Sequence, residues 1–407
     1  MPLVIVMVTS SYPRFPGDSV GTFMEPIAKS VAARGHEVHI VAPWHPLVTR
    51  SASEDGVRFH FFKYAPVASL NVFGYAAAMR ADVSLRGAAY AAAPLALLAG
   101  WRAARKVAVE RRASVMHGHW VVPGGAIAAA AAPSLPLVVS LHGSDVYVAE
   151  TLAPARRVAR SVFRRARAVT ACSSDLARRA LALGADPHST HVVPYGVDVT
   201  RFRPDPAARE VLRRTLQLDD QTSLIFSAGR LVRKKGFEYL IDAVAAISGR
   251  VDVMLAIAGE GDLGSELRER AAAAGLGERV RFLGNQSQDD VAGWLAAADV
   301  IVVPSIRDDS GNVDGLPNVV LESLASGTPL VTTAAGGIGA VVESGRTAVV
   351  VPERDPAALA RAVESLAGNR EARCRLAAAA RQLVTDRFGW NQTARLFEIA
   401  YERALAK

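Results

Sequence analysis

The segment Asp314-Gly-Leu-Pro-Asn-Val-Val-Leu-Glu322 places a carboxylate at each end of a loop that leads into a helix. Pro317 suits the first position of this helix, because its missing N–H would have no partner there, and Gly327 is a typical helix stop. Free N–H groups at a helix start, together with the helix dipole, bind a diphosphate. The residues expected to line this site are Gly315, Leu316, Asn318 and Val319.

The two carboxylates of this segment can serve different parts of a ligand. Asp314 lies just before the helix and Glu322 lies just over one turn inside it. One can therefore face a sugar while the other binds the hydroxyls of a ribose. The alternative is an ordinary loop–helix junction with a capping Asp, and spacing alone does not separate the two interpretations.

A basic turn, Gly229-Arg-Leu-Val-Arg-Lys-Lys-Gly236, directly follows an apolar run that reads as a strand. Arg230 and Lys235 at the carboxyl end of a strand are well placed to stabilise a leaving diphosphate. No metal ion would then be needed for that charge. A solvated basic turn is the other interpretation, and it is the commoner meaning of such a run.

His142-Gly-Ser-Asp145 stands at the end of another expected strand. His142 and Asp145 can hydrogen-bond sugar hydroxyls, and Gly143 lets the backbone approach a ligand. A histidine held by the core is the alternative. The cluster His117, His119 and Trp120 lacks a carboxylate or Cys that would complete a metal site, so packing or acceptor contact is favoured.

Two glycine-containing turns give weaker signals. The turn after the first strand contains Gly17 and Gly21 but no GxGxxG, which argues against a dinucleotide cofactor there. A turn beside a ligand phosphate and a plain turn both fit it. Gly259 and Glu260 resemble a nucleotide-contacting turn.

The elements that must position these residues alternate between strand and helix. A βαβ pattern of this kind predicts a mostly parallel sheet. A linker rich in Pro and Gly, His191–Pro206, separates two such series, and the cleft between two Rossmann-like units is the expected ligand site. The expected strands lie at 3–8, 37–41, 114–117, 137–141, 168–171, 224–228, 253–258, 280–283, 300–303 and 330–332.

Length and composition agree with this division. A chain of 407 residues, 50% of them hydrophobic, exceeds one ordinary core and predicts a globular protein of two domains. Two distant cysteines favour a reducing cytosol. The N-terminus reads as a strand and not as a signal peptide, and the apolar run Ala88–Trp101 is too short to span a bilayer and contains Pro94.

Positive charge is concentrated in the first half of the chain. Residues 1–200 hold 21 Lys and Arg against 12 Asp and Glu, whereas the remainder holds 26 against 27. This excess of positive charge predicts that the first half binds an anionic partner. The sequence contains no nucleic-acid-binding signature. A helix carrying Arg156, Arg160 and Arg164 on one face, with the apolar stretch Pro66–Trp101, predicts docking on an anionic membrane; a solvated Arg-rich face is the alternative.

In this order, the motifs resemble glycosyltransferase family 4, the bacterial group 1 glycosyltransferases, over nearly the whole chain. The resemblance rests on HGSD at 142–145, GRLVRKKG at 229–236, AGEG at 258–261 and DGLPNVVLESLASGTP at 314–329. It implies the GT-B fold, in which two Rossmann-like α/β domains face each other across a cleft. An acceptor-binding domain is expected over 1–195, completed by a returning C-terminal helix at about 386–407, and a nucleotide-sugar-binding domain is expected over 196–385.

The resemblance also implies a reaction and assigns residues to it. The reaction is hexosyl transfer with retention from a UDP- or GDP-sugar, without metal or cofactor. Arg230 and Lys235 hold the diphosphate, Glu322 binds ribose, and Asp314 contacts the hydroxyls of the donor sugar. His142 lies beside the reacting sugar. The resemblance further implies that Gly17 and Gly21 approach the phosphate from the other domain.

Three positions depart from the family pattern. The two-carboxylate motif usually begins with Glu, whereas this chain has Asp314, which is shorter by one methylene. Ala340 stands where relatives often carry Glu, and Ala348 stands where a Gly is common. The last two positions are expected to alter packing more than chemistry.

The leading functional hypothesis is transfer to a lipid-linked cell-envelope or exopolysaccharide intermediate by a cytoplasmic enzyme that contacts the inner face of the membrane. A soluble small-molecule acceptor is the second hypothesis. A nucleotide-sugar epimerase of similar fold and an inactive sugar-nucleotide-binding module are the others. The pairing of the motifs at 229–236 and 314–322 argues against the epimerase.

Overall fold

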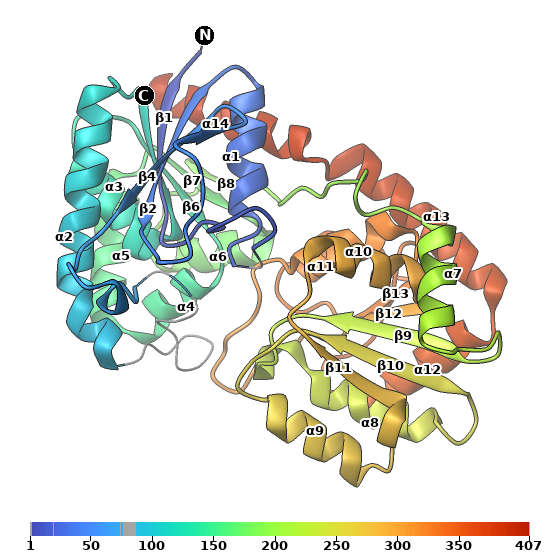
Figure 1. Ribbon diagram of the computed structural model, residues 1–407. Helices are drawn as coiled ribbons and strands as arrows, with labels where there is room; N and C mark the ends of the chain where they lie inside the picture. The colour runs from blue at the N-terminus through green and yellow to red at the C-terminus, as the bar shows by residue number, and fades with distance from the viewer. Residues whose placement is uncertain (1, 19, 74, 76–86, 407) are drawn as a thin grey trace. The chain divides into compact units, whose positions relative to one another are not determined.

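The computed structural model describes residues 2–18, 20–73, 75 and 87–406. The chain forms two compact units (Figure 1). Unit 1 comprises Met1–Tyr195 and Trp390–Lys407, and unit 2 comprises Gly196–Gly389. Each unit is built on one sheet whose central strands are parallel, so the predicted α/β architecture of two Rossmann-like domains is confirmed.

The sheet of unit 1 has the strand order β3-β4-β2-β1-β5-β6-β7-β8. All neighbours pair in parallel except β3 and β4, which are antiparallel. The central strands are continuous apolar runs because helices cover both faces of the sheet. The strands are β1 (Val4–Val8), β2 (Glu37–Pro43), β3 (Ser53–Glu54), β4 (Val57–Phe62), β5 (Val115–His119), β6 (Leu137–Leu141), β7 (Ala168–Ala171) and β8 (Thr190–Val192).

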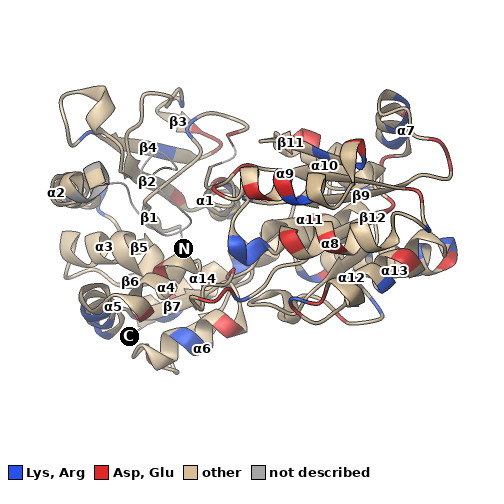
Figure 2. Ribbon diagram, turned by 90° about the horizontal axis from the view of Figure 1, so that it is seen from below, with Lys and Arg blue, Asp and Glu red and all other residues tan. Residues whose placement is uncertain are grey.

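The helices of unit 1 form two layers. In Figures 1 and 2, α2, α3 and α5 lie on one side of the sheet and α1 and α14 lie on the other. Within these layers α2 packs on α3, and α1 packs on α14. The helices are α1 (Met24–Ala33), α2 (Gly87–Glu110), α3 (Ala126–Ala131), α4 (Ser144–Thr151), α5 (Ala153–Arg165), α6 (Ser174–Ala182) and α14 (Trp390–Ala406), with short turns η1 (Ala68–Leu70) and η3 (Trp120–Gly125).

The C-terminal helix α14 returns to unit 1, as predicted. It begins at Trp390, a few residues later than expected, because α13 continues to Arg387. Glu398 of α14 forms an ion pair with Arg34 and lies 3.2 Å from Nε2 of His36, just after α1. The hydroxyl of Tyr401 bonds to a buried histidine of β5. The end of the chain is therefore part of the core of unit 1.

Unit 2 has an all-parallel sheet with the order β11-β10-β9-β12-β13-β14. Helix α8 packs on α9 and α12, and α10 packs on α7 and α11. The strands are β9 (Ser223–Ala228), β10 (Val253–Ala258), β11 (Val280–Gly284), β12 (Val300–Val303), β13 (Leu330–Thr332) and β14 (Val349–Val350). The helices are α7 (Pro206–Thr215), α8 (Phe237–Ile247), α9 (Gly264–Ala273), α10 (Gln288–Ala297), α11 (Asn318–Ser326), α12 (Pro356–Ala367) and α13 (Arg370–Arg387), with short turns η4 (Arg233–Lys235), η5 (Gly277–Arg279) and η6 (Ile338–Ala340).

The apolar run at 88–101 forms the first part of α2, which continues through Pro94 to Glu110. In the described part of the chain, no helix combines the length and the apolar character needed to cross a membrane. The predicted apolar stretch Pro66–Trp101 also includes residues 74 and 76–86, which lie outside the described residues. Cys172 and Cys374 are both free thiols.

Candidate functional site

Helix α11 of unit 2 begins one residue later than the sequence suggested. Pro317 has an extended backbone (φ −68°, ψ 124°) and precedes the helix, which starts at Asn318. The first turn closes where the N–H of Val320 donates to the carbonyl of Pro317 at 3.1 Å. Gly327 ends the helix in the left-handed conformation, as predicted. The N–H groups of Asn318 and Val319 therefore stand at the open end of the helix, where an anion is favoured.

Asp314 sits between two lysine ammonium groups. Its Oδ2 lies 2.6 Å from Nζ of Lys235, and its Oδ1 lies 3.3 Å from Nζ of Lys234. All three side chains are 14% exposed or less. Desolvation acts to raise the pKa of Asp314, but the charges and hydrogen bonds of Lys235 and Lys234 outweigh it, so the pKa lies far below its usual range. Asp314 is thus a buried carboxylate that forms ion pairs with two lysines.

The basic loop, Gly229–Gly236, is held by backbone contacts to the neighbouring loops. The N–H of Leu231 donates to the carbonyl of Glu260, and the N–H of Ile306 donates to the carbonyl of Lys234 at 2.8 Å. Gly236 has a φ of +66°, and a Cβ at this position would lie 2.1 Å from the carbonyl oxygen of Pro304. Only glycine allows this approach, which brings the lysines against the loop that carries Asp314.

The cations of the basic loop take different environments. Burial lowers the pKa of Arg230, and the charges of Asp314 and Asp262 partly oppose that shift. Arg233 instead pairs with Glu266 at the surface, 3.1 Å away, and is 45% exposed. The solvated interpretation of the run therefore holds for Arg233. Lys234 and Lys235 are instead largely buried beside Asp314. Arg230 keeps part of its side chain at the surface, within reach of the charges of Asp314 and Asp262.

Glu322 lies inside α11 and is partly buried. Burial raises its pKa to about 7, and the charges of Arg201 and Lys235 oppose that rise. The carboxyl group is therefore half-protonated near neutral pH. Glu322 lies in the helix that follows Asp314 along the chain.

We expect donor binding to tighten as pH rises if Glu322 accepts hydrogen bonds from ribose. The ionised form, which is the better acceptor, becomes dominant above the raised pKa of about 7. Affinity for a nucleotide sugar should then increase about tenfold between about pH 6 and about pH 8, because its diphosphate does not titrate in this range. Isothermal titration against pH measures this change, and Glu322→Gln should flatten the profile. A slope that persists in Glu322→Gln assigns the titration to another group.

The turn after β10 lies beside the basic loop. The N–H of Gly259 donates to the carbonyl of Gly284 at 2.7 Å, so the loops after β10 and β11 are joined. The carboxylate of Glu260 accepts a hydrogen bond from the amide of Asn285 at 2.9 Å. Sequence reasoning missed Asn285, whose position directly after a strand was the available signal. Nucleotide contact by Gly259 and Glu260 stays a prediction.

In unit 1, His142 belongs to a chain of hydrogen-bonded rings. Its Nδ1 lies 2.7 Å from the hydroxyl of Tyr195, and its Nε2 lies 3.1 Å from Nδ1 of His119. The rings of Phe23 and Trp120 pack on His142, with centroids 4.8 and 4.6 Å away. Desolvation lowers the pKa of His142 well below its usual value and that of His119 to about 3. Both imidazoles are therefore neutral at physiological pH.

Asp145 is engaged by backbone N–H groups rather than open to a ligand. Its Oδ1 accepts from the N–H of Gly143 at 3.0 Å and of His142 at 3.2 Å, and its Oδ2 accepts from the N–H of Val121 at 2.8 Å. The residue is 3% exposed. Burial raises its pKa, and these hydrogen bonds oppose the rise. The geometry favours a role in positioning His142 over the predicted contact with sugar hydroxyls.

His117 is a hydrogen-bonded core residue, as the packing interpretation predicted. Its Nδ1 lies 2.8 Å from the hydroxyl of Tyr401, and its Nε2 lies 2.7 Å from Oγ of Ser140. Sequence reasoning did not foresee that His119 would bond to His142. Across residues 2–18, 20–73, 75 and 87–406, no group of three or more His, Cys, Asp or Glu is placed to hold a metal ion.

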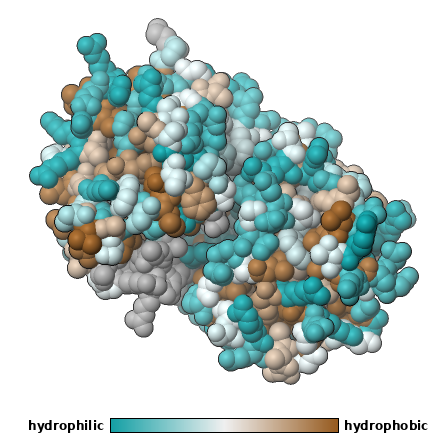
Figure 3. Space-filling view, in the orientation of Figure 1, coloured by the Kyte–Doolittle hydropathy of each residue, from teal (hydrophilic) through white to brown (hydrophobic). Residues whose placement is uncertain are grey.

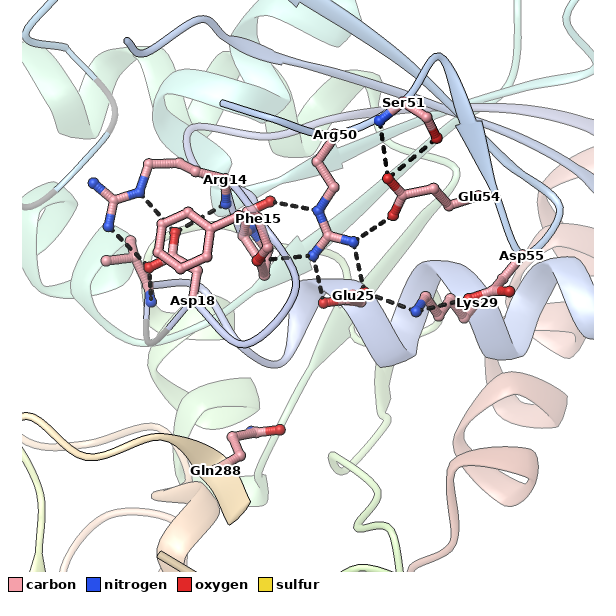
Figure 4. Close-up of polar contacts among 12 residues, drawn as sticks. Arg14, Phe15, Asp18, Glu25, Lys29, Arg50, Ser51, Glu54, Asp55 and Gln288 are labelled. Carbon is pink, nitrogen blue, oxygen red and sulfur yellow. Dashed lines mark hydrogen bonds and ion pairs between the residues drawn. The ribbon is translucent and has the colours of Figure 1, made fainter. Parts of the chain in front are cut away.

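The loop after β1, which carries Gly17 and Gly21, is fastened by two arginines (Figure 4). Arg14 forms a bidentate pair with Asp18, at 2.7 and 2.8 Å. The fully buried side chain of Arg50 donates to the carbonyls of Pro13 and Phe15, and it pairs with two carboxylates. Those carboxylates belong to Glu25 and Glu54, and Lys29 joins Glu25 to Asp55. This network gives a glycine-containing turn a defined shape.

The predicted residues therefore fall into one group in each unit. In unit 2 the structure places Arg230, Lys235 and Asp314 together, with Glu322 in the helix that follows. In unit 1 His142 and Asp145 share one turn, and Gly17 and Gly21 lie on the loop after β1. The unit 2 group combines fixed positive charge, an open helix start and a titratable carboxylate. That combination suits a phosphorylated, hydroxyl-rich ligand.

Two family models match the chain. Residues 20–201 match Glycosyltransferase Family 4, and residues 208–383 match Glycosyl transferases group 1. Among curated proteins, the chain is 34% identical over 264 residues to a GDP-mannose-dependent alpha-(1-6)-phosphatidylinositol monomannoside mannosyltransferase of Mycobacterium tuberculosis, covering 63% of this chain and 67% of the relative. It is 32% identical over 309 residues to a D-inositol 3-phosphate glycosyltransferase of Pseudarthrobacter chlorophenolicus, covering 72% and 71%.

Solved structures share the fold over the whole chain. Anabaena HepE in complex with UDP aligns with a TM-score of 0.77 at 20% identity, covering 98% of this chain and 99% of that one. Sucrose-phosphate synthase from Thermosynechococcus elongatus aligns with a TM-score of 0.80 at 19% identity, covering 99% of each. The fold, with two parallel-sheet α/β units, is therefore shared with glycosyltransferases of the GT-B fold.

Proposed function

This chain belongs to glycosyltransferase family 4, and from that premise we propose that it transfers a hexose from a nucleoside-diphosphate sugar to an acceptor with retention of configuration. The observation that supports the donor assignment is the unit 2 group. Arg230, Lys235 and the start of α11 supply positive charge and N–H donors for the diphosphate. Glu322 is assigned to ribose and Asp314 to the donor sugar.

We also propose that the reaction needs neither metal nor cofactor, because the basic loop supplies the charge that a metal would otherwise place on the leaving diphosphate. In unit 1, neutral His142 is assigned to the reacting sugar, and Gly17 and Gly21 to the phosphate. Asp145 and His119 would hold His142 in place through the contacts described above.

The names of the relatives bear on the acceptor. One relative is described as acting on a phosphatidylinositol monomannoside, which is a lipid, and the other on D-inositol 3-phosphate, which is soluble. These are the two acceptor classes that the sequence left open. We propose the lipid-linked class, a cell-envelope or polysaccharide intermediate, because unit 1 carries an excess of positive charge and exposes apolar side chains.

The experiment that tests the proposed function pairs donors with acceptors. Purified protein is incubated with UDP- and GDP-sugars and with phosphatidylinositol-based lipids or free inositol phosphates, with and without a chelator. The anomeric configuration of the product is then read by NMR. Retention in the presence of the chelator is expected. An inverted product or loss of activity on chelation contradicts the proposed mechanism, and conversion of the donor without any acceptor supports the epimerase alternative.

The membrane part of the proposal rests on the outer surface of α2 and α5, which lie on the same side of the unit 1 sheet (Figure 2). Leu95 and Leu98 of α2 are 55% and 42% exposed, and Leu152 before α5 is 52% exposed. Figure 3 shows patches of hydrophobic surface on unit 1. Arg156 is used internally, because it donates to the carbonyls of Ala149 and Glu150. The exposed arginines of α5 are Arg157, Arg160 and Arg164.

Replacing these three arginines by serine should weaken binding to anionic vesicles about 100-fold, since each basic side chain near an anionic surface contributes about 1 kcal/mol. Co-sedimentation with phosphatidylglycerol vesicles at low and moderate salt measures this. The matched control removes three exposed arginines of unit 2, Arg361, Arg370 and Arg375. Equal loss in both triple variants would indicate general charge attraction, and no vesicle binding by the unaltered protein would remove the membrane part of the proposal.

A further inference from the structure

The donor group of unit 2 contains one cation more than the predicted diphosphate contacts require. Arg230, Lys234 and Lys235 supply three positive charges, and Asp314 removes one of them. Lys234 is 8% exposed, so it is not a solvated surface lysine. A charged lysine in this position is stable only with partners, and the carboxylate of Asp314 is one of them.

The two ion pairs divide the carboxylate between the lysines. Lys235 lies on Oδ2 and Lys234 on Oδ1, at 2.6 and 3.3 Å. If Lys234 were absent, the whole negative charge of Asp314 would fall on Lys235. The cation assigned to the leaving diphosphate would then be neutralised by its neighbour, and it would stabilise developing charge less well.

We propose that Lys234 is a positioning residue that serves as the counter-cation of Asp314 and so leaves the charge of Lys235 available to the donor diphosphate. The proposal rests on the proposed function of the same site. It also accounts for the short side chain at position 314. An Asp held between two lysines is fixed close to the basic loop, whereas a Glu would extend one methylene further.

The charge count predicts the effect of each substitution on binding of a nucleoside diphosphate. The three cationic side chains and Asp314 together carry a net charge of +2 in the unaltered protein. Lys234→Met lowers this net charge to +1. Lys234→Met combined with Asp314→Asn restores the original net charge, because it removes one positive and one negative charge together. Binding of UDP or GDP is the appropriate measurement, since it excludes the sugar that Asp314 is assigned to contact.

We expect Lys234→Met to weaken binding of UDP or GDP about 10- to 30-fold at constant pH and salt, which is the loss of one unit charge about 8–12 Å from a ligand charge at an effective dielectric constant of about 20. The double variant should return to within about threefold of the unaltered protein, and Lys234→Arg should retain most of the affinity. With a nucleotide sugar, Lys234→Met should lower kcat more than it raises KM, because charge develops on the leaving diphosphate. Isothermal titration and steady-state kinetics give these values.

The matched control is Arg233→Met, which removes a cation of the same loop that pairs with Glu266 and Glu238. It should leave affinity and kcat unchanged. If Lys234→Met binds as tightly as the unaltered protein, or if the double variant is as weak as Lys234→Met, the proposal is wrong. If Lys234→Met proves unstable on thermal unfolding, the double variant still tests it, since it should bind UDP or GDP within about threefold of the unaltered protein. Failure of the unaltered protein to bind any nucleoside diphosphate would instead count against the proposed function.

Discussion

Lys235→Ala is expected to lower kcat for sugar transfer about 100- to 1000-fold, the scale reported for removal of one donor to a developing oxyanion, or about 3–4 kcal/mol. The side chain of Lys235 is 13% exposed, and its ammonium group lies 2.6 Å from Asp314. It is therefore already desolvated and oriented before a ligand arrives. Because this cation is preorganised, little reorganisation energy is needed when charge develops on the leaving diphosphate.

Steady-state kinetics with a saturating donor measures this loss, and Arg230→Ala should show a loss of similar size. Arg233→Ala is the control, because its guanidinium pairs with Glu266 and Glu238. Nearly normal turnover in both Lys235→Ala and Arg230→Ala would contradict the assignment of the diphosphate to this loop. A fall in Arg233→Ala equal to that in Lys235→Ala would indicate a general effect of charge on the loop.

Asp145→Asn is expected to lower the free energy of unfolding by about 2–4 kcal/mol, which is large for a substitution that changes one atom. The carboxylate accepts hydrogen bonds from the N–H groups of Val121, His142 and Gly143. An amide has only one oxygen, so its NH₂ group must face at least one backbone N–H in either orientation. A buried donor would then face another donor with no acceptor between them.

Urea unfolding measures the loss, and Asp220→Asn on the exposed surface of unit 2 is the control. Activity should also fall in Asp145→Asn at temperatures where the protein stays folded, because the displaced turn carries His142. Unchanged stability would contradict the hydrogen-bond assignment. If stability fell but activity did not change, Asp145 would stabilise the fold without positioning His142 for the reaction.

Much of the fold follows from local patterns along the chain. Short apolar runs such as Val4–Val8 and Val300–Val303 form buried parallel strands, and Gly35 and Gly327 follow the helices that they were predicted to end. Alternation of strand and helix predicted two parallel sheets, because such connections favour that arrangement. The helix start after Pro317 was misplaced by one residue, since the proline was expected inside the helix and instead precedes it.

The identity of the candidate donor residues was also readable from the sequence. The basic run and the two-carboxylate segment are each contiguous, and the types of residue they contain already indicate chemistry with phosphate and hydroxyl groups. The family resemblance that they carry is confirmed by the matches over 20–201 and 208–383. Their individual roles in binding and catalysis stay predictions.

What only the tertiary structure decided is which polar groups are already satisfied by the protein. Asp145 was expected to meet a sugar, yet three backbone N–H groups occupy its oxygens. Lys234 reads as one charge in a solvated run, yet folding buries it beside Asp314. Residue type determines which hydrogen bonds and charges a side chain can offer, and this information is local. The partners come from loops that are distant along the chain, and burial determines whether those partners are protein, water or ligand.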